Sequence, residues 1–416
     1  MGFSHDRARS RSVLANVSGD DVLERSGLEA SARPAGGAAA SHGALGVRGF
    51  DSVVFAVGNA RQAAHFYATA FGMSLTAYRG PETGHRDDCS YVLESGTARF
   101  VVTGAARPDT PLAGHVAVHG DGVCDVRIAV EDVPTAYAHA VAGGARALEE
   151  PHRLADEHGV VELAAIAAYG PVRHTFVDRS RYRGPYLPGF QPRAFATPVP
   201  ARPYFDAIDH CVAAVEAGRM EEWVDFYQRV LGFSTMTEFV DGEIATRYSA
   251  LRSIVVADPA RRVKFPVVEP AASERASQVD EFLRFHAGPG IQHVALATQD
   301  IRAAVSAMRQ GGVEFLDTPD TYYDDPALPG RLEPLNVSAE DLRHHGILLD
   351  SDTDGTLLQI LTRPLQDRPT GFFELIERHG SLGFGVGNFA ALFHAIERAQ
   401  DGRGNLTPRA EPASAS

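Results

Sequence analysis

Short apolar runs of strand length alternate with helical segments through most of the chain. In the first half, an apolar run at residues 50–55 precedes a helical segment that carries His65-Phe66-Tyr67. In the second half, a run at 208–212 precedes a helical segment that carries Asp225-Phe226-Tyr227, and in both segments a glycine follows the tyrosine by five residues. A recurring order of this kind predicts one strand–helix unit of the same type in each half of the chain.

A second unit follows the first in each half. The apolar runs at 124–128 and 292–296 lead through an aspartate to helical segments that end at the glycine pairs 143–144 and 311–312. A glycine pair at this position is a common signal for the end of a helix. A strand-rich tract then returns in both halves. The pattern therefore predicts four strand–helix–strand units and an α+β fold.

The length of the chain predicts two domains. It has 416 residues, and a single hydrophobic core rarely serves more than about 250–300 residues. We expect one domain at 46–195 and a second at 196–405. Residues 1–45 are rich in Ala, Gly, Ser and Arg, and residues 406–416 are rich in Ala, Ser and Pro. Such segments bury too little apolar surface to offset the entropy lost on ordering. We therefore expect a disordered leader and a disordered tail.

Charge and cysteine content limit the partners and the compartment. The formal net charge of −14 argues against nucleic-acid and anionic-membrane partners, because binding phosphate needs clustered Lys and Arg. The three cysteines are scattered, which excludes a disulfide framework and fits a reducing cytoplasm. The chain contains no run of 18 apolar residues, so we expect no membrane segment. The number of subunits stays open, a homo-oligomer included.

Three residues that can bind a metal lie inside apolar, strand-like runs: His210, His293 and Glu374. A buried charged group must be paired, neutralised or bound to a cation, because an unpaired buried charge is costly. Two imidazoles and one carboxylate that leave coordination positions open form the ligand set of non-haem Fe(II) oxygenases. Taken singly, a histidine in such a run is more often a hydrogen-bonded core residue than a metal ligand.

Five further segments, found in a fixed order, resemble 4-hydroxyphenylpyruvate dioxygenases and the related 4-hydroxymandelate synthases, which are members of the vicinal oxygen chelate superfamily. They lie at 78–84, 119–123, 288–293, 366–370 and 383–389. The resemblance implies four βαβββ units that form two open barrels. The N-terminal barrel carries Ser52 and Asp125 where the C-terminal barrel has His210 and His293, so it is expected to be a scaffold without a metal. A C-terminal helix at 389–400 is expected to close the site as a lid.

The resemblance also implies the chemistry. His210, His293 and Glu374 would bind Fe(II), and O2 would be the co-substrate. The substrate would be an arylpyruvate whose own 2-oxo acid side chain is oxidatively decarboxylated, so no separate 2-oxoglutarate is needed. The same molecule is then hydroxylated.

Further positions carry over from the family to the cavity that holds the substrate. The amides of Gln292 and Gln359 would lie beside the keto acid and the iron. Ser253 and Gln278 would face the ring of the substrate. Phe373, Phe384 and Asn388 would form the wall, the lid and the hinge of the lid. The alternative for each amide is an ordinary hydrogen bond to the neighbouring backbone.

Two positions depart from the dioxygenases that make homogentisate. Val268 stands where those enzymes carry Asn, and Leu361 stands where they carry Phe. Without the Asn the phenol loses a hydrogen bond worth about 1 kcal/mol, and without the Phe the ring is freer to turn. We therefore expect benzylic hydroxylation that gives 4-hydroxymandelate, although Pro266 follows the dioxygenases.

Three alternatives to this product assignment remain. The first is ring hydroxylation with side-chain migration, which gives homogentisate. The second is turnover of another arylpyruvate or of an aliphatic 2-oxo acid, since Val268 removes a partner of the phenol. The third is a binding protein without turnover, which is disfavoured because all three metal ligands are present.

Overall fold

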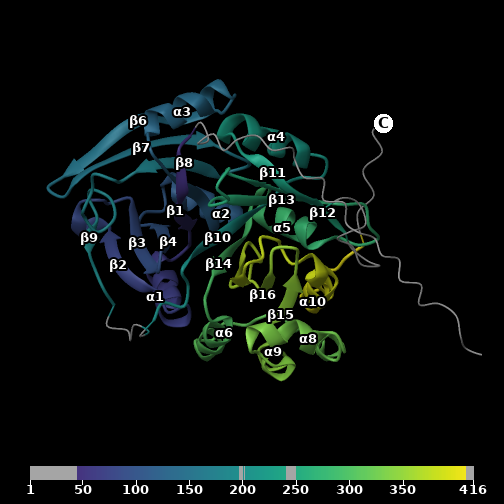
Figure 1. Ribbon diagram of the computed structural model, residues 1–416. Coiled ribbons are helices and arrows are strands. Elements are labelled where there is room, and N and C mark those ends of the chain that lie inside the picture. Colours follow the sequence, from purple (N-terminus) through teal and green to yellow (C-terminus); the bar gives the residue numbers. More distant parts are fainter. Residues whose placement is uncertain (1–44, 196–199, 201, 240–249, 409–416) are drawn as a thin grey trace, which may run out of the picture. The chain divides into compact units, whose positions relative to one another are not determined.

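The computed structural model describes residues 45–195, 200, 202–239 and 250–408 (Figure 1). The predicted leader therefore lies outside the described residues except for Leu45, and the predicted tail does so beyond residue 408. Among the described residues, no helix combines the length and the apolar character needed to cross a bilayer.

The first half contains two strand–helix–strand units and a short connecting helix between them. In chain order the elements are β1 (Val47–Ala56), α1 (Ala60–Ala70), β2 (Ser74–Arg79), η1 (Pro81–Thr83), β3 (Asp88–Ser95), β4 (Ala98–Ala105), α2 (Pro111–His119), β5 (Gly122–Val130), α3 (Val133–Ala142), β6 (Ala147–Asp156), β7 (Gly159–Ala167), β8 (Arg173–Asp178) and β9 (Gln191–Pro192).

The second half repeats this order, with extra short helices in its last unit and a terminal helix (Figure 1). Its elements are β10 (Ala207–Ala214), α4 (Met220–Leu231), β11 (Ser234–Phe239), β12 (Leu251–Ala257), β13 (Lys264–Pro270), α5 (Gln278–His286), β14 (Gly290–Ala297), α6 (Ile301–Gln310), α7 (Asp320–Tyr323), α8 (Leu328–Leu332), η2 (Glu333–Leu335), α9 (Ala339–His345), β15 (Leu348–Ser351), β16 (Thr356–Leu361), β17 (Phe372–His379), η3 (Val386–Asn388) and α10 (Phe389–Gly402).

Local sequence signals fix the ends of the repeated helices. The side chains of Asn59, Asp132 and Asp300 accept hydrogen bonds from backbone N–H groups in the first turns of α1, α3 and α6. Such caps satisfy donors that a helix leaves unpaired at its start. At the other end of α4, Gly232 adopts φ +66, a left-handed conformation that favours glycine. The helix ends predicted from glycines and glycine pairs are confirmed.

The second half forms an eight-stranded sheet, and the first half forms a nine-stranded one because β9 pairs with β2. A pairing of Val123 on β5 with Ile291 on β14 joins the two. In the second half the order is β11, β12, β13, β10, β14, β17, β16 and β15. The first strands of the two units, β10 and β14, pair antiparallel, and each pairs in parallel with the last strand of its own unit. The first half follows the same scheme around β1 and β5. Within the described residues no pairing joins the outer strands β11 and β15, so the sheet stays open. The predicted α+β fold of four βαβββ units is confirmed.

The two sheets match residue by residue at their centres. Asp125 pairs with Val54 in the first sheet, as His293 pairs with Val212 in the second. In the N-terminal barrel the position of His293 is thus taken by Asp125. Instead of a metal ligand set, Asp125 Oδ2 accepts hydrogen bonds from Arg127 Nε at 3.0 Å and from Thr175 Oγ1 at 2.8 Å. A guanidinium and a hydroxyl compensate this buried carboxylate.

Strand β17 joins the two halves through its outward face. The ring of Phe373 lies with its centroid 5.0 Å from that of Phe71 and 5.6 Å from that of Phe100. Both partners belong to the N-terminal barrel, and all three side chains are buried. Aromatic pairs at these distances add to the stability gained from burial. The N-terminal barrel therefore supports the strand that carries Glu374.

A buried histidine forms a second connection between the halves. Nδ1 of His174, on β8, lies 3.3 Å from the Val126 carbonyl oxygen, and its Nε2 lies 3.0 Å from the hydroxyl of Tyr227 on α4. Burial lowers the pKa of this imidazole from 6.5 to about 4. The neutral form is therefore the one that the fold accommodates.

We predict that this histidine makes the fold sensitive to acid. Its contribution is fully present above pH 6.5 and is lost as the pH falls toward 4, because only the unfolded chain binds the proton in that window. The loss amounts to about 3 kcal/mol. In urea titrations between pH 6.5 and 4, the unfolding free energy of His174→Gln should fall less steeply than that of the wild type. The exposed His158→Gln serves as control, and equal slopes for all three proteins would contradict the prediction.

Candidate metal centre

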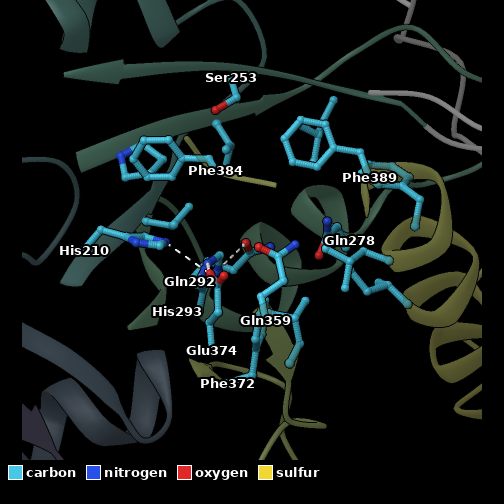
Figure 2. A pocket seen from close by; sticks show the side chains of 18 of the residues that line it. His210, Ser253, Gln278, Gln292, His293, Gln359, Phe372, Glu374, Phe384 and Phe389 are labelled. Carbon is cyan, nitrogen blue, oxygen red and sulfur yellow. Dashed lines mark hydrogen bonds and ion pairs between the residues drawn. The ribbon is translucent and has the colours of Figure 1, made fainter. Parts of the chain in front are cut away.

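Three neighbouring strands bring His210, His293 and Glu374 together. They lie on β10, β14 and β17, which are adjacent in the sheet. His210 Nε2 lies 3.2 Å and His293 Nε2 lies 3.5 Å from Glu374 Oε2. One ligand atom from each residue lies within 4.8 Å of the others, and among the described residues this is the only such group of three. Figure 2 shows the three side chains pointing to a common centre.

The protonation states suit a cation. Burial by itself would raise the pKa of the Glu374 carboxyl, but hydrogen bonds and charge from His210 and His293 lower it to about 2. The group is therefore an ionised carboxylate at neutral pH. Burial also lowers the pKa of His293, which favours the neutral imidazole that binds metals. Burial acts in the same direction on His210, but hydrogen bonds and charge from Asp209 and Glu374 outweigh it and raise the pKa of that imidazole, so an ion would bind there in exchange for a proton.

A carboxylate orients the first histidine. Asp209 Oδ1 lies 2.7 Å from His210 Nδ1, which leaves Nε2 directed at the centre. Arg378 donates two hydrogen bonds to Asp209, at 2.9 and 3.0 Å, and Lys264 Nζ lies 2.9 Å from it. Burial opposes ionisation, but His210 and the two cations hold the pKa of Asp209 well below its usual value. Histidine ligands of metals usually donate their second N–H to such a group.

The donor set fits a divalent ion. Its three ligands come from one wall of a cavity and leave the opposite side open, which is the arrangement of non-haem ferrous sites. The cavity has a volume of about 710 Å³, including the part open to solvent. It is lined by His210, Val212, Leu251, Ser253, Val255, Pro266, Val268, Gln278, Gln292, His293, Gln359, Leu361, Phe372, Glu374, Phe384, Phe389, Leu392, Phe393 and Ile396.

The cavity is apolar except for its amides and its metal ligands. Two amide oxygens, Gln278 Oε1 and Gln359 Oε1, are buried without a hydrogen-bond partner. Buried polar atoms are nearly always paired, so these atoms mark positions where a polar ligand group would bind. Gly385 lies directly on Gln359, because a Cβ atom at that glycine would come within 2.4 Å of the amide. The start of the C-terminal segment thus forms part of the cavity wall.

Of the predicted site residues, all line this cavity except Phe373 and Asn388. Phe373 is corrected, because successive residues of a strand point to opposite faces: Phe372 shares the face of Glu374, whereas Phe373 lies in the aromatic core. Asn388 is buried outside the cavity wall, where its Oδ1 accepts a hydrogen bond from Tyr322 at 3.0 Å. The roles of the remaining predicted residues stay predictions.

Several lining residues were not predicted. Phe372 stacks on His293 with ring centroids 4.6 Å apart, and Phe389 opens helix α10 on the other side of the cavity (Figure 2). Counting two residues back from Glu374 would have identified the first. The apolar stripe on α10 contained the signal for the second, together with Leu392, Phe393 and Ile396. Leu251 and Val255 flank Ser253 at the alternate positions of β12.

Comparison with known protein families shows which superfamily the chain belongs to. The sequence model of the Glyoxalase/Bleomycin resistance protein/Dioxygenase superfamily matches residues 49–167 and 207–328. The chain therefore belongs to this superfamily, and the paired barrels with a histidine–carboxylate centre agree with that assignment.

Relatives narrow the family further. The chain is 43% identical over 369 residues to 4-hydroxyphenylpyruvate dioxygenase of Yarrowia lipolytica, an alignment that covers 86% of this chain and 94% of the relative. It is also 43% identical to the enzyme of that name from Dictyostelium discoideum, covering 86% and 100%. A variant of 4-hydroxymandelate synthase from Streptomyces coelicolor superposes with a TM-score of 0.76 at 32% identity, covering 86% and 100%. Within the superfamily, the protein is a non-haem iron dioxygenase of the 4-hydroxyphenylpyruvate dioxygenase and 4-hydroxymandelate synthase family.

We predict that two neighbouring phenylalanines differ in how much they contribute to the free energy of unfolding. Phe373→Ala should lower the free energy of unfolding by about 3–5 kcal/mol, because it empties a site in the buried aromatic cluster. Phe372→Ala should cost less, since its ring faces the open cavity. Urea unfolding of both variants without metal checks this order. A larger loss for Phe372→Ala would contradict the assignment of the two faces of β17.

Proposed function

We propose that this protein is an Fe(II)-dependent 4-hydroxyphenylpyruvate dioxygenase that forms homogentisate and CO2 from 4-hydroxyphenylpyruvate and O2. The observation that carries the proposal is the convergence of His210, His293 and Glu374 on one wall of a mainly apolar cavity. The cavity offers an ion site, polar groups next to it and room for an aromatic ring.

His210, His293 and Glu374 would hold the iron through Nε2 of each imidazole and the carboxylate. Bound ferrous iron supplies the redox chemistry that lets O2 decarboxylate a 2-oxo acid. Asp209 keeps His210 oriented with Nε2 toward the ion. The carboxylate of Glu374 stays ionised because two imidazoles lie beside it.

The cavity amides would orient the substrate. Gln292 and Gln359 lie in the wall with the metal ligands and can donate N–H groups to the anionic keto acid. Gln278 and Ser253 lie in the same cavity and can pair with the phenol hydroxyl. The phenol hydroxyl can donate to Gln278 Oε1, which is buried without a partner. An acceptor that folding has already desolvated gains most from such a donor.

Aromatic side chains would keep water from the reacting atoms. The Phe384 ring lies 5.1 Å from that of His210, and Phe372 stacks on His293. Phe389 and the apolar face of α10 complete the wall (Figure 2). Closure by such groups excludes water, which protects reactive species from side reactions.

The product assignment differs from the one that the sequence favoured. Val268 and Leu361 suggested 4-hydroxymandelate, but the relatives that share 43% identity over nearly their full length are named 4-hydroxyphenylpyruvate dioxygenases. The structural neighbour named 4-hydroxymandelate synthase shares 32%. These comparisons support ring hydroxylation better than benzylic hydroxylation.

Benzylic hydroxylation remains a second candidate because of one observation. Val268 and Leu361 both line the cavity, and Val268 cannot hydrogen-bond to a phenol. Leu361 pairs with Glu374 across β16 and β17, so the wall directly beside the ligand set is aliphatic. A ring that is held less firmly there could present its benzylic carbon for hydroxylation instead.

We predict that activity depends on iron held by Glu374. Glu374→Gln replaces a charged ligand by a neutral one, so purified protein should contain far less iron and show little O2 uptake with 4-hydroxyphenylpyruvate. Glu377→Gln, on the opposite face of β17, should retain both. Iron analysis and oxygen electrode traces measure the two quantities. Full turnover after complete chelation of iron would refute the proposal.

We predict homogentisate as the main product of the wild type. The double variant Val268→Asn, Leu361→Phe should increase the homogentisate share and favour 4-hydroxyphenylpyruvate over phenylpyruvate by about fivefold more than the wild type, which corresponds to one added hydrogen bond of about 1 kcal/mol. The two products are isomers, so chromatographic retention rather than mass identifies them. A wild type that releases mainly 4-hydroxymandelate would establish the second candidate in place of the first.

A further inference from the structure

One guanidinium contacts both the orienting carboxylate of the metal centre and the start of the lid segment. Nε and Nη2 of Arg378 donate to the two oxygens of Asp209, which in turn lies against His210. Nη1 of the same side chain donates to the carbonyl oxygens of Ser381 at 3.2 Å and Gly383 at 2.7 Å. These carbonyls belong to the turn between β17 and the lid helix α10.

The same guanidinium also supports a wall of the cavity. Its carbon lies 5.7 Å from the centre of the Phe384 ring, within the range of a cation–π contact. The other neighbour of that ring is His210, 5.1 Å away. Arg378 therefore contacts both Asp209 and Phe384, and each of these two residues contacts the metal ligand His210.

The two hydrogen bonds from an arginine to both oxygens of an aspartate form a clamp. The N-terminal barrel contains the same clamp without the neighbouring histidine ligand. Asp51 precedes Ser52 as Asp209 precedes His210, and Nε and Nη2 of Arg179 donate to both oxygens of Asp51, at 2.6 and 2.7 Å. Nη1 of Arg179 donates to the carbonyl oxygen of Tyr186, which lies in the segment after β8. The position of the second cation, Lys264, is taken by Arg99, 3.5 Å from Asp51.

The comparison separates two roles of the clamp. Both copies connect an aspartate on the first strand to an arginine at the end of the next unit, Arg378 on β17 and Arg179 directly after β8, so each stabilises its barrel. Only the second copy has an imidazole on the aspartate, since Ser52 replaces it in the first, where the hydroxyl donates to Asp51 at 3.0 Å. Any effect on metal binding must therefore be specific to the second copy.

We propose that Arg378 is a positioning residue that fixes His210 through Asp209 and couples the metal centre to the lid segment 381–384; the inference rests on the proposed metal centre. A planar guanidinium that binds both carboxylate oxygens fixes the plane of Asp209. Lys264 binds as a single flexible point charge and cannot do this alone. With the plane of Asp209 fixed, the hydrogen bond to Nδ1 keeps Nε2 of His210 on the metal.

The test compares Arg378→Gln with Arg179→Gln, which removes the matching clamp from the barrel without metal ligands. Metal-free full-length protein is titrated with Co(II), followed by calorimetry and by the visible absorption of the bound ion. We expect Arg378→Gln to weaken Co(II) binding by about 10–100-fold, the usual effect of losing a group that orients a metal ligand, and to change the absorption spectrum. Arg179→Gln should bind Co(II) as the wild type does, although its thermal stability should fall by a similar amount.

A second readout tests the coupling to the lid. Hydrogen exchange of residues 381–389 should accelerate in Arg378→Gln and remain unchanged in Arg179→Gln. Arg378→Lys keeps the charge without the paired hydrogen bonds, so it should bind Co(II) with an affinity between those of the wild type and Arg378→Gln. This variant also serves as the test if Arg378→Gln does not fold.

The outcomes separate the clamp from the metal centre. Wild-type Co(II) affinity in Arg378→Gln or Arg378→Lys, or an equal loss in Arg179→Gln, overturns the positioning role and leaves the metal centre intact. Wild-type protein that binds no stoichiometric Co(II), or Glu374→Gln that binds it as tightly, overturns the metal centre and with it the inference. Unchanged exchange in 381–389 overturns the coupling to the lid.

Discussion

The ionised carboxylate of Glu374 inside a barrel is the constraint on which the site depends. A buried charge is tolerated only when its surroundings compensate it. Around Glu374 the formal charges of Asp209, Arg378 and Lys264 add one negative and two positive charges, and an imidazole must be neutral to bind a metal. With both imidazoles neutral, the charges of the cluster balance without the ion. A divalent ion makes it positive, and this suits a substrate that carries a carboxylate.

The N-terminal barrel meets the same constraint in another way. Its central carboxylate, Asp125, is paired through Oδ2 with the guanidinium of Arg127 and the hydroxyl of Thr175, so its charge is compensated within the chain. The two barrels share their strand order and their aspartate–arginine clamps but differ in what neutralises the central charge. This difference explains how one barrel acts as support, through the packing of Phe373 against its aromatic core, while the other has an open ion site.

Features with a local signal in the sequence could be predicted, and features that depend on distant contacts could not. The four units follow from periodicity and from glycines at helix ends. Apolar neighbours mark His210, His293 and Glu374 as candidates, and the family resemblance selects them as metal ligands. The assignment of Phe373 to the cavity was wrong because side chains alternate along β17, so that Phe373, next to Glu374, points to the opposite face. The position of Asn388 depends on Tyr322, which is 66 residues away, and the pairing of Asp209 with Arg378 spans 169 residues. Neither contact can be recognised from the hydrophobic and polar pattern of the residues around it.

Control of the reaction outcome is spread over several elements. The far end of the ring would meet Val268 on β13 and Ser253, its cross-strand partner on β12. The side of the ring would meet Leu361 on β16, opposite Glu374, and the remaining walls come from Phe384 in the segment 381–384 and from Phe389 at the start of α10. Arg378 contacts the Phe384 ring and the Gly383 carbonyl, and it also binds the carboxylate of Asp209. Under the proposed function, the angle between ring and metal would be set jointly by the sheet and by the segment 381–389, so Val268 and Leu361 would not by themselves determine which carbon is hydroxylated.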